Sequence, residues 1–484
     1  MVLIVELIVI ILYLIGMIGI GAYYTRRAGL SESNFYVAGR SISGFWGGMA
    51  IASDYTSAGT LVAGVGLALA FGGWAMYIWP CLLVVFGFLL FAFTLGPRLR
   101  AKGFTTLPDH IEQVSGTTFL RGVAAVFILF IMGVYLIVQL KSIGLVGEYV
   151  LGIPYWVAVL IMGGTYIAYV VLGGMASSIW TGVVQMIMML IATFLLFGMS
   201  ITYAGGLDAL MSATVEKAPW FMTVEGKVGL EFPITYGFIM MFIMLALPHV
   251  LMRGYSARDE TEARRTFIWG AFWNGIFYLF FLFVLVAMMA YVMPHDRPDM
   301  AWILLTGKVL PSHVAIGFAL AALLAACMST TSAQLIAASA AVSHDIYAKT
   351  IKRGREISEL RLAWLGRITA LIVGIVTLLI TLNPPHLVGK MLILAGSLGG
   401  ASFLVPLYGG LYWPKLANKY SIGAAMIGGF VTVILTHPLF HILPIEPQTW
   451  PGIIGVVVSF ILFIAIGLFT SKSTLSQNYP PAKV

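Results

Sequence analysis

Runs of apolar residues recur along the whole chain and are separated by short polar segments. A helix needs about 20 such residues to cross a bilayer, whereas the strands of a membrane barrel alternate polar and apolar residues with a period of two. The runs do not alternate in this way, so the pattern predicts an all-α polytopic membrane protein with thirteen transmembrane helices. The expected spans are residues 3–24, 46–70, 74–96, 121–146, 155–173, 177–203, 233–252, 267–292, 313–343, 363–382, 387–412, 421–438 and 452–470.

Basic side chains predict the orientation of these spans. If the N-terminus lies outside, most of the 27 lysines and arginines fall in inner loops, in agreement with the positive-inside rule. Lys141 falls within the fourth span. An odd number of spans then places the C-terminus inside. The basic residues left in outer loops are Lys217, Lys227, Arg297, Lys308 and Lys390.

The composition limits the class of protein. Hydrophobic residues make up 60% of the 484 positions and charged residues only 10%, compared with about 25% charged residues in soluble proteins. We therefore expect a multi-pass protein of the cell membrane, with the lipid bilayer as its surroundings. The net charge of +8 reflects membrane orientation, so no nucleic-acid partner is expected. The sequence has no phosphate-binding loop, nucleophilic serine motif or zinc motif; we expect no enzyme, and an oligomer is not required.

Two spans contain residues that disfavour a continuous helix. Residues 51–66, IASDYTSAGTLVAGVG, place Asp54, four serine and threonine hydroxyls and several glycines at the middle of the second span. In the seventh span, Pro248 lacks a backbone donor and tends to kink the helix. Interrupted helices in corresponding positions of two repeats are typical of a transporter binding site.

The positions of these breaks predict an inverted repeat. The seventh span opens a second block of five helices, and because five is odd, this block has the opposite topology. The expected division is 1–45 for an extra N-terminal span and inner loop, 46–203 for the first repeat, 204–232 for an outer loop, 233–412 for the second repeat, and 413–484 for two C-terminal spans and a tail.

The ninth span contains four consecutive hydroxyl residues, 329–332, and then Gln334, all within a segment of small apolar residues. In a helix, the carbonyl of Ala326 and the hydroxyl of Ser329 lie on one face because they are three residues apart. With Thr330 and carbonyls from a neighbouring unwound helix, they would surround a small hard cation with about five oxygens. Alternatively, the hydroxyls bond to their own helix and permit close packing.

Several stretches of the chain resemble the sodium:solute symporter family. They extend over nearly its whole length and are FYVAGRSISGF (35–45), VLGGMASSIWTGVVQ (171–185), LPHVLMR (247–253), AACMSTTSAQL (325–335), AVSHDIYA (341–348) and GGLYWPKLANKYSIGAAMIGG (409–429). The resemblance implies thirteen spans with the N-terminus outside, a LeuT-like five-plus-five inverted repeat, and inward solute movement coupled to a sodium gradient.

The resemblance also implies a Na+ site between the first and eighth helices of the repeats. Carbonyls would come from the broken first helix, and a carbonyl with two hydroxyls from the eighth helix. Some members have a second Na+ site with an aspartate in a Trp-Thr-Asp motif; here Gly182 takes that position, so one Na+ is expected. The implied ligands are Ser53, Thr56, Ala326, Ser329 and Thr330.

The substrate branch is less sharply defined. LPHVLMRGYSARDETEARRT and AVSHDIYA resemble acetate and short-chain monocarboxylate symporters, whereas MSTTSAQL and the LNPPHLV and GGLYW region resemble pantothenate symporters. The expected function is sodium-coupled import of a small monocarboxylate such as acetate, propionate, pyruvate or lactate. The alternatives are a sodium/pantothenate symporter and a proton-coupled carboxylate symporter that uses Asp54. A channel is disfavoured because the polar residues cluster at mid-depth.

Polar residues near the breaks are candidates for substrate binding. Lys141 could attract a carboxylate or balance Asp54, or it could snorkel or pair with Glu148. Asp54 could also bind sodium, relay a proton or cap the break, and His249 could contact the substrate or satisfy carbonyls freed by the kink. Arg253, at the cytoplasmic end, is expected to be a snorkelling anchor. The predicted substrate residues are Asp54, Tyr55, Tyr135, Gln139, Lys141 and His249.

Overall fold

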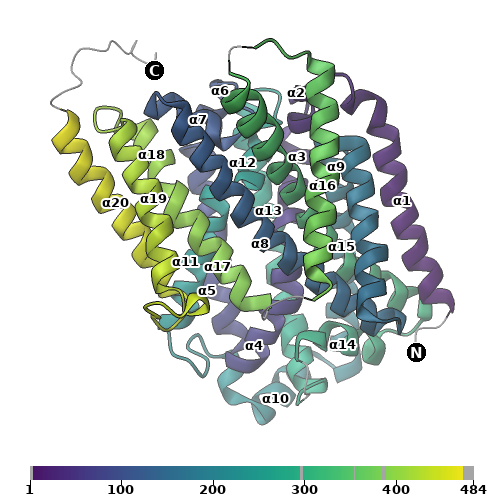
Figure 1. The fold of residues 1–484 in the computed structure, drawn as a ribbon. Helices are drawn as coiled ribbons and strands as arrows, with labels where there is room; N and C mark the ends of the chain where they lie inside the picture. Colours follow the sequence, from purple (N-terminus) through teal and green to yellow (C-terminus); the bar gives the residue numbers. More distant parts are fainter. Residues whose placement is uncertain (1–3, 295–297, 354, 384–387, 472–484) are drawn as a thin grey trace.

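The structure is a computed structural model that describes residues 4–294, 298–353, 355–383 and 388–471. Within these ranges the chain forms helices, with an isolated β-bridge between Ile42 and Ala257. The long helices run roughly side by side through one bundle (Figure 1). Many aliphatic and aromatic side chains on its outer surface are exposed, among them Ile4, Leu379 and Phe469, as expected for a surface that faces lipid.

Ten helical segments among the described residues are long and apolar enough to cross a membrane, and the number is up to twelve if two bent pairs each count as one span. The all-α membrane architecture is therefore confirmed. The unbroken segments are α1 (Ile4–Ala28), α5 (Gly73–Phe93), α8 (Thr118–Leu151), α9 (Tyr155–Ala204), α13 (Glu260–Tyr291), α15 (His313–Ala340) with the π-helix η5 (Ala341–Ile351), α16 (Glu359–Thr381), α17 (Val388–Gly399) with η6 (Gly400–Leu404) and α18 (Val405–Tyr412), α19 (Lys419–Thr436) and α20 (Trp450–Ser471).

The two bent pairs occur at the two predicted breaks. The second span consists of α3 (Gly44–Tyr55), then the π-helix η2 (Gly59–Gly64) and α4 (Val65–Phe71), with a bend of 49°. The seventh span consists of α11 (Glu231–Ala246) and α12 (Pro248–Tyr255), with a bend of 43°. Leu247 is extended, with φ −83° and ψ 136°, as is usual for a residue that precedes proline. Both predicted interruptions are confirmed.

The helix α9 covers two of the predicted spans. Its 50 residues would extend over ~75 Å as a straight helix, more than twice the ~30 Å thickness of a bilayer core. It bends at Gly174, whose φ of 57° and ψ of −146° are not helical. A Cβ at this position would lie 2.6 Å from the carbonyl oxygen of Phe35, so glycine is required there. The bend falls between the predicted spans 155–173 and 177–203.

Short helices gather at the two ends of the bundle. α2 (Glu32–Val37), α6 (Gly96–Ala101) and α7 (Leu107–Ser115) lie at the end where α20 finishes, at the top of Figure 1. α10 (Leu207–Lys217) and α14 (Ala301–Val309) lie at the opposite end, where α1 begins.

The helices pack in two groups that meet at α3. One group contains α3, α5, α11 and α13, and the other contains α1, α8, α9, α15 and α16; α3 also packs against α9 and α15. Gly48 permits the close approach of α3 and α13, because a Cβ there would lie 2.3 Å from the Cβ of Trp269. The interrupted helix α3 therefore lies at the junction between the two groups.

Candidate functional site

The break between α3 and η2 is held open by hydrogen bonds that replace those of a helix. The hydroxyl of Ser57 accepts a bond of 3.0 Å from the backbone N–H of Gly59. The side-chain oxygen of Gln139, on α8, accepts a bond of 3.3 Å from the N–H of Ala58, and the hydroxyl of Thr60 donates to the carbonyl of Tyr55. These partners satisfy backbone groups that the interruption would otherwise leave unpaired in the bundle interior. Gln139 therefore contacts the break itself.

Two neighbouring hydroxyls of α15 meet the end of α3 just before this break. The hydroxyl of Ser329 donates to the carbonyl of Ser53, at 2.9 Å, and to the carbonyl of Ala326, at 3.1 Å. The hydroxyl of Thr330 donates to the carbonyl of Asp54, at 2.6 Å. All of these residues are buried. The Ala326 carbonyl and the Ser329 hydroxyl lie on one face of α15, as expected, and the bond between them is of the kind expected if the hydroxyls bond to their own helix. The bonds to Ser53 and Asp54 bring oxygens of both helices within hydrogen-bond distance of each other.

This oxygen cluster suits a small cation, although it differs in detail from the expected set. The carbonyl that contacts Thr330 belongs to Asp54, whereas the carbonyl of Thr56 was expected as the second ligand from α3. The hydroxyls of Ser53 and Thr56 are buried and have no hydrogen-bond partner among the described residues. Neutral carbonyl and hydroxyl oxygens are the ligands that hard cations accept. An entering Na+ would replace the hydrogen bonds of Ser329 and Thr330 by contacts to the same oxygens.

The carboxylate of Asp54 is paired with Arg253, which lies on α12. Arg253 donates from Nε to Oδ2 at 2.6 Å and from Nη2 to Oδ1 at 2.8 Å, and both side chains are almost completely buried. The prediction that Arg253 snorkels at the cytoplasmic surface is therefore wrong. The ion pair of Asp54 in this structure is thus with Arg253, whereas Lys141 was one of the partners considered for it. The bend at Leu247 redirects α12, so that Arg253 points into the bundle and not toward its end.

The same guanidinium connects the two broken helices to the unbroken ones. Nη2 of Arg253 donates to the hydroxyl of Ser178 on α9, at 2.8 Å. Ser178 in turn shares a hydrogen bond of 2.7 Å with Ser332 on α15. Four elements, α3, α12, α9 and α15, are thus joined by one chain of hydrogen bonds beside the oxygen cluster. Charge-assisted bidentate bonds of this kind are the strong members of their class.

A small cavity lies on the other side of the break. It has a volume of about 40 Å³ and contains space for only a few atoms. Tyrosine side chains dominate its polar lining, together with Ser57 and Thr60, and apolar residues line the remainder. The lining residues are Tyr55, Ser57, Gly59, Thr60, Gly64, Met76, Tyr77, Pro80, Cys81, Val84, Tyr135, Tyr236, Met240, Ile243, Tyr278 and Leu392.

Three of these tyrosine hydroxyls are positioned by backbone carbonyls or by the hydroxyl of Thr60. Tyr55 donates to the carbonyl of Met240, and Tyr77 donates to the carbonyl of Thr60. Tyr278 lies 3.4 Å from the hydroxyl of Thr60. The cavity therefore has a fixed ring of aromatic walls, with the hydroxyls of the break segment exposed to it.

The predicted substrate residues occupy different positions around this cavity. Tyr55 and Tyr135 line it. His249 is buried and packs edge-to-face against Tyr135, with the ring centroids 5.8 Å apart, so it lies behind the lining. Gln139 contacts the break, and Asp54 contacts Arg253, as described above. Lys141 is half-buried and does not belong to the lining residues.

Several residues of the site were not predicted. Arg253 was assigned to the surface because it follows the proline by only five residues and was placed near the span end. Ser57 and Thr60 lie in the polar run TSAGT (56–60), a signal that could have identified them. Tyr77, Tyr236 and Tyr278 come from three different helices, and no local pattern marks them as neighbours.

Comparison with known proteins identifies the family and the fold of the chain. A profile described as "SSF: Sodium:solute symporter family" matches residues 35–431. A Na+-coupled sialic acid symporter, solved in a substrate-bound outward-open state with a novel Na+ site, is 20% identical; the match has a TM-score of 0.80 and covers 99% of each chain.

Two structures of Mhp1 are also similar in fold. An inward-facing conformation is 13% identical, with a TM-score of 0.53 and coverage of 88% of this chain and 91% of that chain. A closed conformation of Mhp1, a nucleobase-cation-symport-1 family transporter with bromovinylhydantoin bound, is 15% identical, with a TM-score of 0.54 and coverage of 91% and 96%. At these identities the matches establish a shared LeuT-like fold. Because the family profile covers most of the sequence, this chain belongs to the sodium:solute symporter family and is a multi-pass transporter that couples solute movement to Na+.

Proposed function

We propose that this chain imports a small monocarboxylate, such as acetate, propionate, pyruvate or lactate, together with Na+. The observation that supports this most directly is the size of the tyrosine-lined cavity. Its volume is about 40 Å³, and a volume on the order of 10–15 Å³ holds one water molecule. A solute of a few heavy atoms therefore fits in this conformation, whereas a sugar acid needs a much larger space.

The chemistry of the lining suits a short-chain carboxylate. The hydroxyls of Ser57 and Tyr135 offer donors for carboxylate oxygens, while Met76 and Val84 offer apolar surface for a methyl group. Lysine, arginine and histidine are absent from the described residues that line the cavity. The positive charge that balances the substrate then comes from Na+ in the neighbouring oxygen cluster.

The short segment between Ser53 and Thr60 gives a physical route for coupling. The carbonyls of Ser53 and Asp54 point toward α15, and the side chains of Tyr55, Ser57 and Thr60 contact the cavity. Na+ bound on one side of this segment would order the residues that contact the substrate on its other side. In this proposal the Na+ ligands are Ser53, Ala326, Ser329 and Thr330, together with a carbonyl of Asp54 or Thr56.

The alternatives receive less support. Pantothenate is larger than the cavity, so its transport requires a wider conformation of the same site. Proton coupling through Asp54 requires a carboxylate that can release Arg253, yet the guanidinium engages both oxygens at 2.6 and 2.8 Å. We therefore retain Na+ as the coupling ion in the proposal, with one Na+ per cycle because Gly182 offers no carboxylate.

The proposed topology has thirteen spans, with the N-terminus outside and the C-terminus inside. The bend of α9 at Gly174 allows this helix to count as two spans. The beginning of α1 and the end of α20 lie at opposite ends of the bundle (Figure 1), as an odd number of spans requires. Arg297 and the basic residues of the C-terminal tail lie outside the described residues. The end that contains α2, α6 and α7 is the cytoplasmic end in this proposal.

Uptake by purified protein in liposomes tests the function. Labelled acetate, propionate, pyruvate, lactate, pantothenate and sialic acid are supplied one at a time, with an imposed Na+ gradient, an imposed proton gradient, or choline in place of Na+. We expect a Na+ gradient to drive accumulation of one of the small monocarboxylates. Uptake of pantothenate or sialic acid alone would reject the substrate class, and full accumulation in choline would reject the coupling ion.

A further inference from the structure

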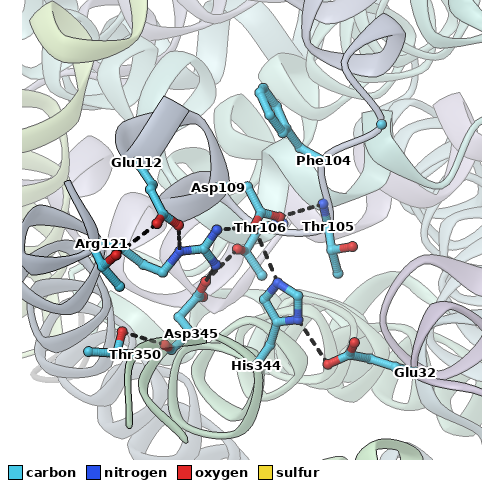
Figure 2. A network of polar contacts seen from close by, with 12 residues as sticks. Glu32, Phe104, Thr105, Thr106, Asp109, Glu112, Arg121, His344, Asp345 and Thr350 are labelled. Carbon is cyan, nitrogen blue, oxygen red and sulfur yellow. Dashed lines mark hydrogen bonds and ion pairs between the residues drawn. The ribbon is translucent and has the colours of Figure 1, made fainter. Parts of the chain in front are cut away.

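A second buried polar network lies away from the Na+ and substrate region, at the end of the bundle that contains α2 and α7 (Figure 2). Arg121, on α8, is at its centre. It forms ion pairs with Asp109 and Glu112 of α7 and with Asp345 of η5. His344, also on η5, lies between Asp109 and Glu32 of α2. The network thus joins four segments, and neither the coupling ion nor the substrate cavity uses it.

The hydrogen bonds of His344 define where a proton is held. Its Nδ1 lies 2.8 Å from Oε1 of Glu32, and its Nε2 lies 3.3 Å from Oδ1 of Asp109. A neutral imidazole has one N–H, and a carboxylate only accepts hydrogen bonds. Two carboxylate partners therefore require either an imidazolium or a proton on one of the carboxylates.

The environment of Asp109 shows that this carboxylate carries no proton. Its Oδ2 accepts hydrogen bonds from the backbone N–H groups of Thr105 and Thr106, at 2.8 and 3.0 Å. Its Oδ1 accepts one from Arg121, at 2.6 Å. Burial alone would raise the pKa of Asp109, but the hydrogen bond and charge of His344 and the charge of Arg121 outweigh burial and lower it. Asp109 is therefore ionised, and the Nε2 of His344 donates to it.

The second ring nitrogen then faces Glu32 with one proton between them. Either His344 is an imidazolium that donates to an ionised Glu32, or a protonated Glu32 donates to a neutral His344. Both descriptions place one exchangeable proton in the contact between α2 and η5. We infer that this contact is a proton-binding site, and that the bound proton stabilises the attachment of α2 to the cytoplasmic end of α15.

Within the described part of the chain, the charged groups nearest this proton belong to the network, and the titratable neighbour beside them is Tyr36 of α2, whose hydroxyl shares a hydrogen bond with Ser343 of η5. Glu32 faces it from α2, Asp109 from α7, and Asp345 from η5 itself. Arg121 of α8 neutralises part of the charge of Asp109 and Asp345. The remaining carboxylates are Glu112, which ion-pairs with Arg121, and Glu359 of α16, which accepts a bond of 3.1 Å from the backbone N–H of Glu32. The acidic side chains outnumber the basic ones, so the site attracts positive charge, and both ring nitrogens of His344 face carboxylate oxygens that can share a proton with them.

The position of α2 gives this proton a consequence for the transport cycle. α2 precedes α3, whose other end provides carbonyls to the oxygen cluster. η5 extends α15, which provides the hydroxyls. When the proton leaves for the cytoplasm, the lone pair of Nδ1 faces the Glu32 carboxylate and the contact becomes repulsive. The attachment is thus complete at low pH and is lost as the pH rises, and its loss frees the inner end of α3 to move away from α15.

Two measurements test this inference without the substrate. The first is selective ¹⁵N-histidine NMR of the whole protein in nanodiscs between pH 6 and 9, with His344 assigned by its absence in His344→Gln. We expect the His344 ring to keep both protons to a higher pH than the other seven of the eight histidines. A His344 ring that is neutral at pH 7, with Glu32 ionised, would overturn the inference.

The second measurement is the distance between spin labels on Ser33→Cys, in α2, and Lys349→Cys, an exposed position in η5, with both native cysteines replaced by alanine. A longer distance should appear as the pH rises, with the same midpoint as the NMR titration. Glu32→Gln should lower that midpoint by at least about one unit, a tenfold loss of proton affinity. His441→Gln, at an exposed histidine near the other end of the bundle, is the matched control and should leave the midpoint unchanged. A distance that does not depend on pH, or an unchanged midpoint in Glu32→Gln, would contradict the inference; neither result depends on which solute is transported.

Discussion

The buried pair of Asp54 and Arg253 leads to a quantitative prediction. Asp54→Asn keeps the size of the side chain but leaves the guanidinium without its charge partner in a fully buried position. Removal of one partner of a buried ion pair costs about 3–5 kcal/mol. Unfolding entropy is roughly 2.1 cal/mol/K per residue, so this cost corresponds to a decrease of about 3–5 °C in the unfolding temperature of a chain of 484 residues. The decrease is measured by intrinsic fluorescence during heating of the purified protein.

The paired variant separates this interaction from general damage. Arg253→Gln alone leaves an unpaired carboxylate and should lower the unfolding temperature by a similar amount. In Asp54→Asn/Arg253→Gln, two neutral amides replace the two charges, and we expect at least half of the lost stability to return. Arg264→Gln is the control, because Arg264 is exposed and stacks only against Phe93; its effect should be within about 0.5 kcal/mol.

The same variants measure the link to sodium. The backbone carbonyl of Asp54 accepts a hydrogen bond from the hydroxyl of Thr330. Displacement of the Asp54 side chain should move this carbonyl and raise the Na+ concentration for half-maximal uptake. The double variant should recover part of this change together with its stability. The reasoning is refuted if both single variants unfold within about 1 °C of the wild type, or if the loss in the double variant equals the sum of the single losses.

Three further predictions follow from individual contacts. Ser329→Ala removes one oxygen of the cluster and should raise the Na+ concentration for half-maximal uptake about tenfold, if that ligand contributes ~1.4 kcal/mol. The control is Thr331→Ala, because the hydroxyl of Thr331 bonds back to its own helix, and it should not change this concentration. Equal effects of the two substitutions would argue against the ligand assignment. Tyr135→Phe removes a hydroxyl that lines the cavity and should raise the KM for the transported carboxylate by about 2- to 10-fold, whereas an unchanged KM would place the substrate elsewhere. Gly48→Ala should lower the unfolding temperature, because overpacking costs about 1–3 kcal/mol. Gly198→Ala is the control and should not lower it, because no atom lies near the added Cβ. Equal stability of the two variants would contradict the close packing of α3 and α13.

The sequence allowed prediction of the features that depend on local chemistry. Apolar length predicted the all-α membrane architecture, although the structure supports ten to twelve candidate spans among the described residues and not the full thirteen. Polar residues and Pro248 predicted both breaks. The run of hydroxyls in α15 pointed to the contact with α3, because residues three apart on a helix share one face. Each of these signals is contained within a few neighbouring residues.

The remaining features depend on contacts between distant segments. Asp54 and Arg253 are far apart in the chain, and only the bend at Leu247 turns Arg253 inward. A lysine within a span looked like the more direct partner for the buried carboxylate. The tyrosine lining likewise combines several helices, and periodicity along one helix contains no information about such neighbours. The bend of α9 at Gly174 was not distinguishable from a loop between two spans.

The shared segment Ser53–Thr60 has a thermodynamic consequence for slippage, that is, for transport of one ligand without the other. If Na+ and the solute order the same residues, the ligand that binds first must overcome the loss of conformational entropy in that segment. The second ligand binds to a segment that is already ordered, so its binding does not carry this cost. Linkage then requires that Na+ strengthens solute binding by the same factor by which the solute strengthens Na+ binding. Transporters with only one of the two ligands bound would therefore be rare at working concentrations. The fixed ratio of Na+ to solute would follow from the backbone segment between the two sites, with no further control step.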